Sequence, residues 1–182
     1  YHGAAYAVVE ACAKAVAAGA EFGGMRFSYQ EYFERMHTAR SWGKPLAALL
    51  GALRMQVELG LPSIGGKDSM SGTFQQINVP PMLMAFGITT VDARRVISTD
   101  LKEAGRTLWN YASERIAAGR IVAGYAVGFG GVAEALAKMA FGNGIGAEVE
   151  LPEEALFAYD YGSIVVESTV ELDAPFAVRL GR

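Results

Sequence analysis

One stretch of the sequence concentrates most of its chemically useful residues: positions 61–74 read LPSIGGKDSMSGTF. The two glycines before Lys67 free the backbone to turn its amides toward an anion, and the lysine supplies a mobile positive charge. The Asp68 carboxylate is able to hold a metal or orient a partner group, and Ser69 and Ser71 add hydroxyls. The stretch therefore predicts a nucleotide or interface site at these four residues, with an ordinary solvated turn as the alternative.

The stretch is not a Walker A phosphate loop. That pattern needs a glycine where Leu61 stands and a serine or threonine where Asp68 stands. It also needs a helix directly afterwards, and the prolines at 80 and 81 would keep any such helix short. A phosphate bound here would depend on a different geometry.

A second glycine-rich segment, GFGGVA at 128–133, lies between an expected strand and an expected helix. Gly128, Gly130 and Ala133 satisfy the GxGxxA form of the dinucleotide-binding fingerprint, and Gly131 lies among them. This interpretation predicts a dinucleotide-binding module whose preceding strand is central in a parallel sheet. The alternative is a tight turn from strand to helix.

Composition and charge narrow the classes of protein. The 182 residues are 52% hydrophobic and carry a net charge of −3, which excludes disorder and argues against a basic nucleic-acid surface. One cysteine, Cys12, and two histidines exclude a disulfide framework and disfavour a structural zinc site. No apolar run approaches a membrane span and no signal peptide opens the chain, which predicts a cytoplasmic protein with no nucleic-acid or membrane partner. Because the chain does not begin with methionine, we expect a piece of a longer protein.

Hydrophobic periodicity predicts an α/β or α+β protein. Helices are expected over 6–20, over 45–57 with Gly60 as the stop, over 112–118 and over 132–141. The second of these carries an apolar stripe of leucines. Ser28 to Glu31 resembles a helix capping box, so a short helix is expected through Met36. Strands are expected over 82–91, 106–109, 121–127, 145–151 and 163–169, with a domain boundary near Arg94.

Four segments, in order along the chain, resemble the second synthase repeat of phosphoribosylformylglycinamidine synthase, the large amidotransferase of purine biosynthesis. They are residues 3–10, residues 61–74 with the prolines that follow, residues 123–135 and residues 138–143. The resemblance implies a fold similar to aminoimidazole ribonucleotide synthetase. Its N-terminal domain, 1–94, would contribute strands to an interface barrel, and its C-terminal α/β sandwich domain would span 95–182.

The family converts formylglycinamide ribonucleotide to formylglycinamidine ribonucleotide with ATP, magnesium and ammonia from glutamine. The resemblance therefore implies a fragment of a carbon–nitrogen ligase, with the first synthase repeat and the glutaminase domain of the same enzyme as partners. The fragment is expected to act as a structural or auxiliary nucleotide-site repeat without catalytic residues, inactive alone. Self-association through the barrel face is expected of it.

The chain departs from the family pattern at the site of an auxiliary nucleotide. In relatives that nucleotide is held through magnesium, with a carboxylate and an asparagine on the first helix and an acidic turn among the ligands. Here Glu10 matches the carboxylate, but Lys14 stands at the asparagine position and the turn at 126–129 has no carboxylate. Because magnesium demands oxygen ligands, this implies a degenerate, metal-free pocket in which the Lys14 ammonium stands where a metal would. The resemblance also implies a longer segment between Trp109 and Asn110, so either this protein is shortened there or the sequence omits a loop.

Overall fold

The computed structural model describes residues 1–111 and 119–182, so the helix expected over 112–118 lies outside the described residues. The chain forms two compact units. Unit 1 comprises Tyr1–Ala11 and Gly23–Ile88, and unit 2 comprises Cys12–Phe22 and Thr89–Arg182. The domain boundary near Arg94 stays a prediction; contacts within the chain divide it after Ile88 and assign the second part of the first helix to unit 2.

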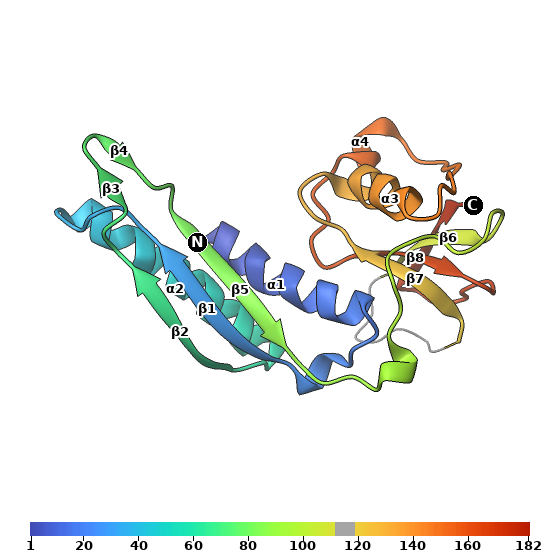
Figure 1. Ribbon diagram of the computed structural model, residues 1–182, viewed down its shortest axis with the longest axis horizontal. Helices are drawn as coiled ribbons and strands as arrows, with labels where there is room; N and C mark the ends of the chain where they lie inside the picture. The colour runs from blue at the N-terminus through green and yellow to red at the C-terminus, as the bar shows by residue number, and fades with distance from the viewer. Residues whose placement is uncertain (112–118) are drawn as a thin grey trace. The chain divides into compact units, whose positions relative to one another are not determined.

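Unit 1 is built on a three-stranded sheet in the order β2-β1-β5 (Figure 1). The central strand β1 (Arg26–Tyr32) is parallel to β2 (Ser63–Ser69) and antiparallel to β5 (Met82–Ile88). Helices α1 (His2–Ala17) and α2 (Ala39–Leu59) supply Ala4 and Ala48, which pack against Phe33 just beyond β1. A short hairpin of β3 (Thr73–Phe74) and β4 (Ile77–Asn78) precedes β5. Single turns of 3-10 helix follow α1 at Phe22–Gly24 and β5 at Ala93–Arg95.

The helix expected from Ser28 to Met36 is wrong, because this segment begins in strand β1. Phe27, Tyr29, Glu31 and Phe33 are all buried and the residues between them are not, which is the two-residue period of a strand with one covered face. The serine and glutamate that resemble a capping box sit on opposite faces of this strand. Burial of every second side chain stabilises the strand, and this outweighs the local tendency of Ser28 and Glu31 to begin a helix.

Helix α2 begins earlier than expected, and its small residues form its buried face within unit 1. Thr38 is the N-cap: its hydroxyl accepts from the Ser41 amide in a capping box, so Pro45 lies inside the helix. Gly60 ends the helix at φ 68°, as predicted. The buried residues are Ser41, Pro45, Ala48, Gly51 and Ala52. The predicted apolar stripe instead faces outward; it comprises Leu46, Leu49, Leu50, Leu53 and Val57, with Trp42 beside it.

Unit 2 is an antiparallel four-stranded sheet in the order β7-β8-β6-β9. Its strands are β6 (Thr107–Tyr111), β7 (Ile121–Ala126), β8 (Ile164–Ser168) and β9 (Ala177–Gly181), and its helices are α3 (Gly131–Phe141) and the short α4 (Glu153–Leu156). The predicted strands over 106–109, 121–127 and 163–169 and the helix over 132–141 are confirmed. The strand predicted over 145–151 is wrong, since only Val149 forms a bridge, to Gly181.

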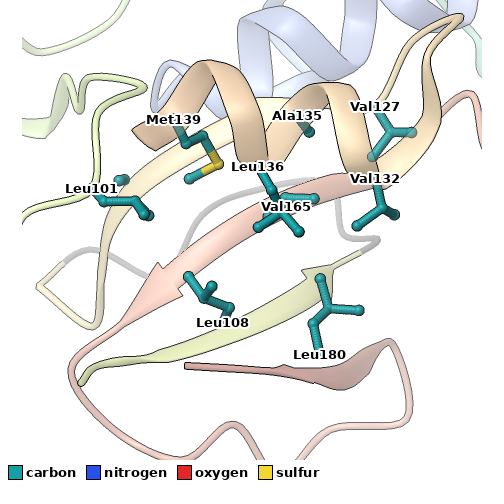
Figure 2. Packing of buried hydrophobic residues seen from close by; sticks show 10 residues of the cluster. Leu101, Leu108, Val127, Val132, Ala135, Leu136, Met139, Val165 and Leu180 are labelled. Atoms are coloured by element: carbon teal, nitrogen blue, oxygen red, sulfur yellow. The ribbon is translucent and has the colours of Figure 1, made fainter. Parts of the chain in front are cut away.

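Both faces of the unit 2 sheet are covered. On one face Val165 packs with α3, whose buried side chains in Figure 2 point toward the strands; they are Val132, Ala135, Leu136 and Met139. On the other face Ile164 and Val166 pack with Ala13, Val16 and Ala17 of α1 and with Trp109. Every residue of β8 is consequently buried. Among the described residues, no helix is both long enough and apolar enough to span a bilayer.

Candidate functional site

Lys67 and Ser69 lie on the face of the unit 1 sheet that none of the described helices covers, which we call the open face. The parallel register places Lys67 beside Gln30 and Ser69 beside Tyr32. Lys67 Nζ donates a hydrogen bond to Ser69 Oγ at 2.9 Å and lies 5.9 Å from the centroid of the Tyr32 ring. An ammonium and a hydroxyl held together on an exposed strand are suited to bind an anionic group.

The open face also carries apolar side chains, which lie on strand β5. Met82, Phe86 and Ile88 lie on the same face of β5 and are 43% to 52% exposed. Their register partners on β1 are Tyr32, Ser28 and Arg26. A contiguous exposed apolar surface of this kind is typical of a protein interface.

Asp68 points to the opposite face of the strand, toward the buried Glu31 of β1. Both carboxylate oxygens of Glu31 lack a hydrogen-bond partner within the described structure. Burial, and then the neighbouring Asp68, raises the pKa of Glu31 to about 7. The three consecutive residues therefore do not form one cluster: strand alternation separates Asp68 from Lys67 and Ser69.

Ser71 follows β2 in an exposed bend, where its carbonyl accepts from the Thr73 amide at 2.8 Å. The predicted turn begins only here, because the residues from Lys67 to Ser69 belong to the strand. A role for the Ser71 hydroxyl stays a prediction.

The glycines of the second motif form a tight turn from β7 into α3. Gly131 has φ 68°, and a Cβ there would lie 2.5 Å from the Leu156 carbonyl oxygen, so only glycine fits. The amide of Gly130 donates to Glu134 Oε2 at 2.8 Å. Hydrogen bonds first from Lys138 and then from this amide lower the pKa of Glu134, so a carboxylate of the chain itself occupies the helix start.

This arrangement contradicts the dinucleotide-binding interpretation of Gly128, Gly130 and Ala133. The strand before the turn, β7, is antiparallel to β8 and is the outer named strand of its sheet. The predicted central strand of a parallel sheet is therefore wrong. A pyrophosphate would also have to displace the Glu134 carboxylate.

Glu10 and Lys14 lie one helical turn apart on α1, Glu10 in unit 1 and Lys14 in unit 2. The positive charge of Lys14 contributes to the lowered pKa of Glu134, which places the ammonium close to the turn at Gly130. Over the described residues no three His, Cys, Asp or Glu side chains gather as a metal site would require. Burial raises the pKa of the Cys12 thiol to about 11, which makes it a poor nucleophile at neutral pH.

The sequence interpretation missed a polar cavity of about 410 Å³ in unit 1. It is walled by the segment from Glu34 to Lys44 and by Thr73 and Asn78 of the β3–β4 hairpin. The signal that would have drawn attention to it is the cluster of four basic residues within ten positions, FERMHTARSWGK at 33–44. The hairpin's contribution depends on contacts between residues far apart in sequence.

No protein-family model matches the sequence, and the search of curated proteins gives no match. Solved structures do match. PurL of T. maritima complexed with AMPPCP superposes with a TM-score of 0.67 at 16% identity, over 92% of this chain and 33% of that chain. HypE of E. coli, a hydrogenase maturation protein, gives 0.66 at 13% identity over 91% and 65% of the two chains. Thiamine monophosphate kinase of Aquifex aeolicus gives 0.62 at 14% identity over 100% and 79%.

The chain spans about one third of the length of the PurL chain that it matches. These neighbours share the fold of aminoimidazole ribonucleotide synthetase, and this chain has the same mixed α/β fold, which confirms the predicted fold class. At identities of 13–16% the likeness establishes the fold alone.

Proposed function

We propose that this chain is one synthetase-like repeat of an ATP-using enzyme, and specifically the second synthase repeat of phosphoribosylformylglycinamidine synthase. The observation that carries the proposal is the open face, where the hydrogen-bonded pair of Lys67 and Ser69 on β2 and the exposed apolar side chains of β5 lie on the same side of one sheet. The four sequence motifs support the specific family. The crystallisation of PurL and of an Aquifex aeolicus thiamine monophosphate kinase with AMPPCP supports the use of ATP.

The open face is the surface through which the repeat would pair. An apolar sheet face left in water is costly at roughly 25 cal/mol per Å², so a partner sheet that covers it gains that free energy. In the complete enzyme the partner is the first synthase repeat, and in isolation it is a second copy. Either pairing would close the strands into the interface barrel.

The proposed reaction activates an amide oxygen by phosphoryl transfer and then displaces the phosphate with ammonia. Such chemistry requires cationic groups to hold the phosphate charge. Lys67 supplies one, and Ser69 holds its ammonium in a fixed position on the strand. A glutaminase domain would supply the ammonia, in the cytoplasm.

Magnesium serves the complete enzyme in this proposal, but the residues Glu10 and Lys14 do not fit it. Magnesium requires oxygen ligands, whereas Lys14 brings a cation and Glu134 is engaged by Lys138 and the Gly130 amide. We therefore assign this region a structural role, with the Lys14 ammonium standing where relatives place a metal.

Lys67→Ala in the complete enzyme tests the proposal. Synthase turnover should fall by about tenfold or more, since one cation that holds developing charge is lost, while glutamine hydrolysis is unchanged. Arg54→Ala, a change at an exposed arginine of α2, serves as the matched control. Full synthase turnover in Lys67→Ala would show that the pair of Lys67 and Ser69 has no role in the reaction, and would contradict the proposal.

A further inference from the structure

The polar cavity of unit 1 lies where the parallel strands β1 and β2 end. Glu34 and Arg35 follow the end of β1, and Thr73 follows the end of β2. The Phe33 amide donates to the Ser69 carbonyl at 2.8 Å and so holds the two strand ends together. The carboxyl ends of parallel strands are the usual place for ligands in α/β sheets. Lys67, Asp68 and Ser69 do not line the cavity, so it is separate from the pair on the open face.

The charge of the cavity is positive after its internal pairs are counted. Its one carboxylate, Glu34, is engaged on both oxygens: one pairs with Lys44, and the other accepts from Asn78 Nδ2 at 2.8 Å. Arg35 and Arg40 also line the cavity, and within the described residues neither guanidinium has an ion pair or a side-chain hydrogen bond. Two arginine side chains are therefore available to an anion.

The walls of the cavity are fixed before any ligand arrives. Thr73 Oγ1 accepts from the Arg35 amide at 2.9 Å and donates to Asn78 Oδ1 at 2.8 Å, which ties the hairpin to the segment after β1. The Thr38 capping box fixes the start of α2 beside it. A preformed site loses less conformational entropy on binding, so modest contacts suffice for affinity.

We propose that this cavity binds the phosphate group of a small phosphorylated molecule, with Arg35 and Arg40 as its ligands. The planar guanidinium matches a phosphate through two parallel hydrogen bonds, and the positive end of the α2 dipole adds to the attraction. A volume of about 410 Å³ lies in the range of small-ligand sites. The net charge of −3 opposes a polyanionic ligand such as nucleic acid. The inference goes beyond the proposed ligase role and does not require it.

Isothermal titration calorimetry on the full-length protein tests the proposal, with ribose 5-phosphate and ATP as separate probes. We expect Arg35→Gln and Arg40→Gln each to weaken binding of at least one probe about tenfold. Arg54→Gln, at an exposed arginine on the far part of α2, should leave both affinities unchanged. Thermal unfolding of all variants should coincide with that of the natural sequence, because both cavity arginines are exposed.

Weakening confined to ribose 5-phosphate would support a sugar phosphate as the ligand, and weakening of ATP would support a nucleotide phosphate. The proposal is overturned if both probes bind all four proteins alike, or if Arg54→Gln weakens binding as much as the cavity variants. Because the readout is binding, this result is independent of the turnover of Lys67→Ala.

Discussion

Unit 2 covers both faces of its sheet, whereas unit 1 covers one and leaves the other open. In unit 2 the central strand β8 is wholly buried between α3 and the second part of α1. In unit 1 the edge strand β2 is exposed along almost its whole length, and the apolar residues of β5 face outward. Unit 2 therefore buries the apolar surface of its sheet within its own fold, while unit 1 retains exposed apolar surface that suits an interface.

Each unit buries a glutamate, and the two glutamates differ in their hydrogen-bond partners. Glu167 of unit 2 accepts from the amides of Lys102 and Glu103 and pairs with Arg106 at 3.3 Å. Glu31 of unit 1 is equally buried, but its oxygens have no hydrogen-bond partner among the described residues. A buried carboxylate without hydrogen-bond partners costs free energy of folding when it is charged. Glu31 is therefore a second feature of unit 1, beside the open face, that packing within the unit does not stabilise.

The largest expected effect concerns association through the open face. Phe86→Asp places a charge on the apolar strand β5 of that face and should abolish association of the protein with a second copy, since an unpaired charge cannot be buried there. Val178→Asp, at an exposed position of β9 in unit 2, is the matched control and should associate normally. Sedimentation velocity measures both. Association of Phe86→Asp at natural strength would show that the open face is not an interface.

A pair of leucine truncations compares a buried core position of unit 2 with the exposed stripe of α2 in unit 1. Leu108→Ala empties a buried position of unit 2 and should lower the free energy of unfolding by about 3 kcal/mol. Leu53→Ala, on the outward stripe of α2, should change it by less than about 0.5 kcal/mol. Urea denaturation measures both variants. Equal losses would mean that the stripe of α2 is covered in solution.

The pH dependence of stability should identify Glu31. Its pKa is raised from an ordinary value of 4.5 to about 7, so its contribution to stability is fully present below about pH 4.5 and is lost as the pH rises to about 7. Glu31→Gln removes this loss, so its stability relative to the natural sequence should increase by up to about 3 kcal/mol across that window. Urea denaturation at several pH values gives the difference. A constant difference for Glu31→Gln would refute the assignment.

Two glycines with the same positive φ allow the cost of backbone strain to be separated from the cost of steric crowding. Gly60 and Gly131 both have φ 68°, but a Cβ at Gly60 would meet open space, whereas one at Gly131 would lie 2.5 Å from the Leu156 oxygen. Gly60→Ala should cost about 1 kcal/mol from backbone strain alone. Gly131→Ala should cost about 2 kcal/mol or more, because crowding adds to the strain. Thermal unfolding that ranks the two variants the other way would contradict the packing at the start of α3.

The sequence predicted the elements whose periodicity is undisturbed, such as α1, the end of α2 at Gly60, and β7, β8 and α3. It failed at β1, where the spacing of Ser28 and Glu31 imitates a helix cap while the burial pattern of the same segment has a period of two. No local signal told the two apart. The choice came from tertiary packing against α1 and α2, which lie outside the segment itself.

The sequence predicted which residues belong to the candidate site but not which of their side chains lie together. The residues from Lys67 to Ser69 stand out by their chemistry, yet strand alternation decides which of them face one another. The cavity of unit 1 could not be predicted from local sequence, because its walls are joined by long-range hydrogen bonds. Arg35 bonds to Thr73 and Glu34 bonds to Asn78, across 38 and 44 positions of the chain. Such pairings are set by the path of the whole unit.

The placement of the two tryptophans gives each unit its own optical reporter. Trp42 lies on the outward stripe of α2 with more than half of its surface in water, and Trp109 is almost fully enclosed within the sheet of unit 2. Whatever covers α2 will shift the indole emission of Trp42 to shorter wavelength and protect it from iodide quenching. The emission of Trp109 will stay unchanged until unit 2 itself melts.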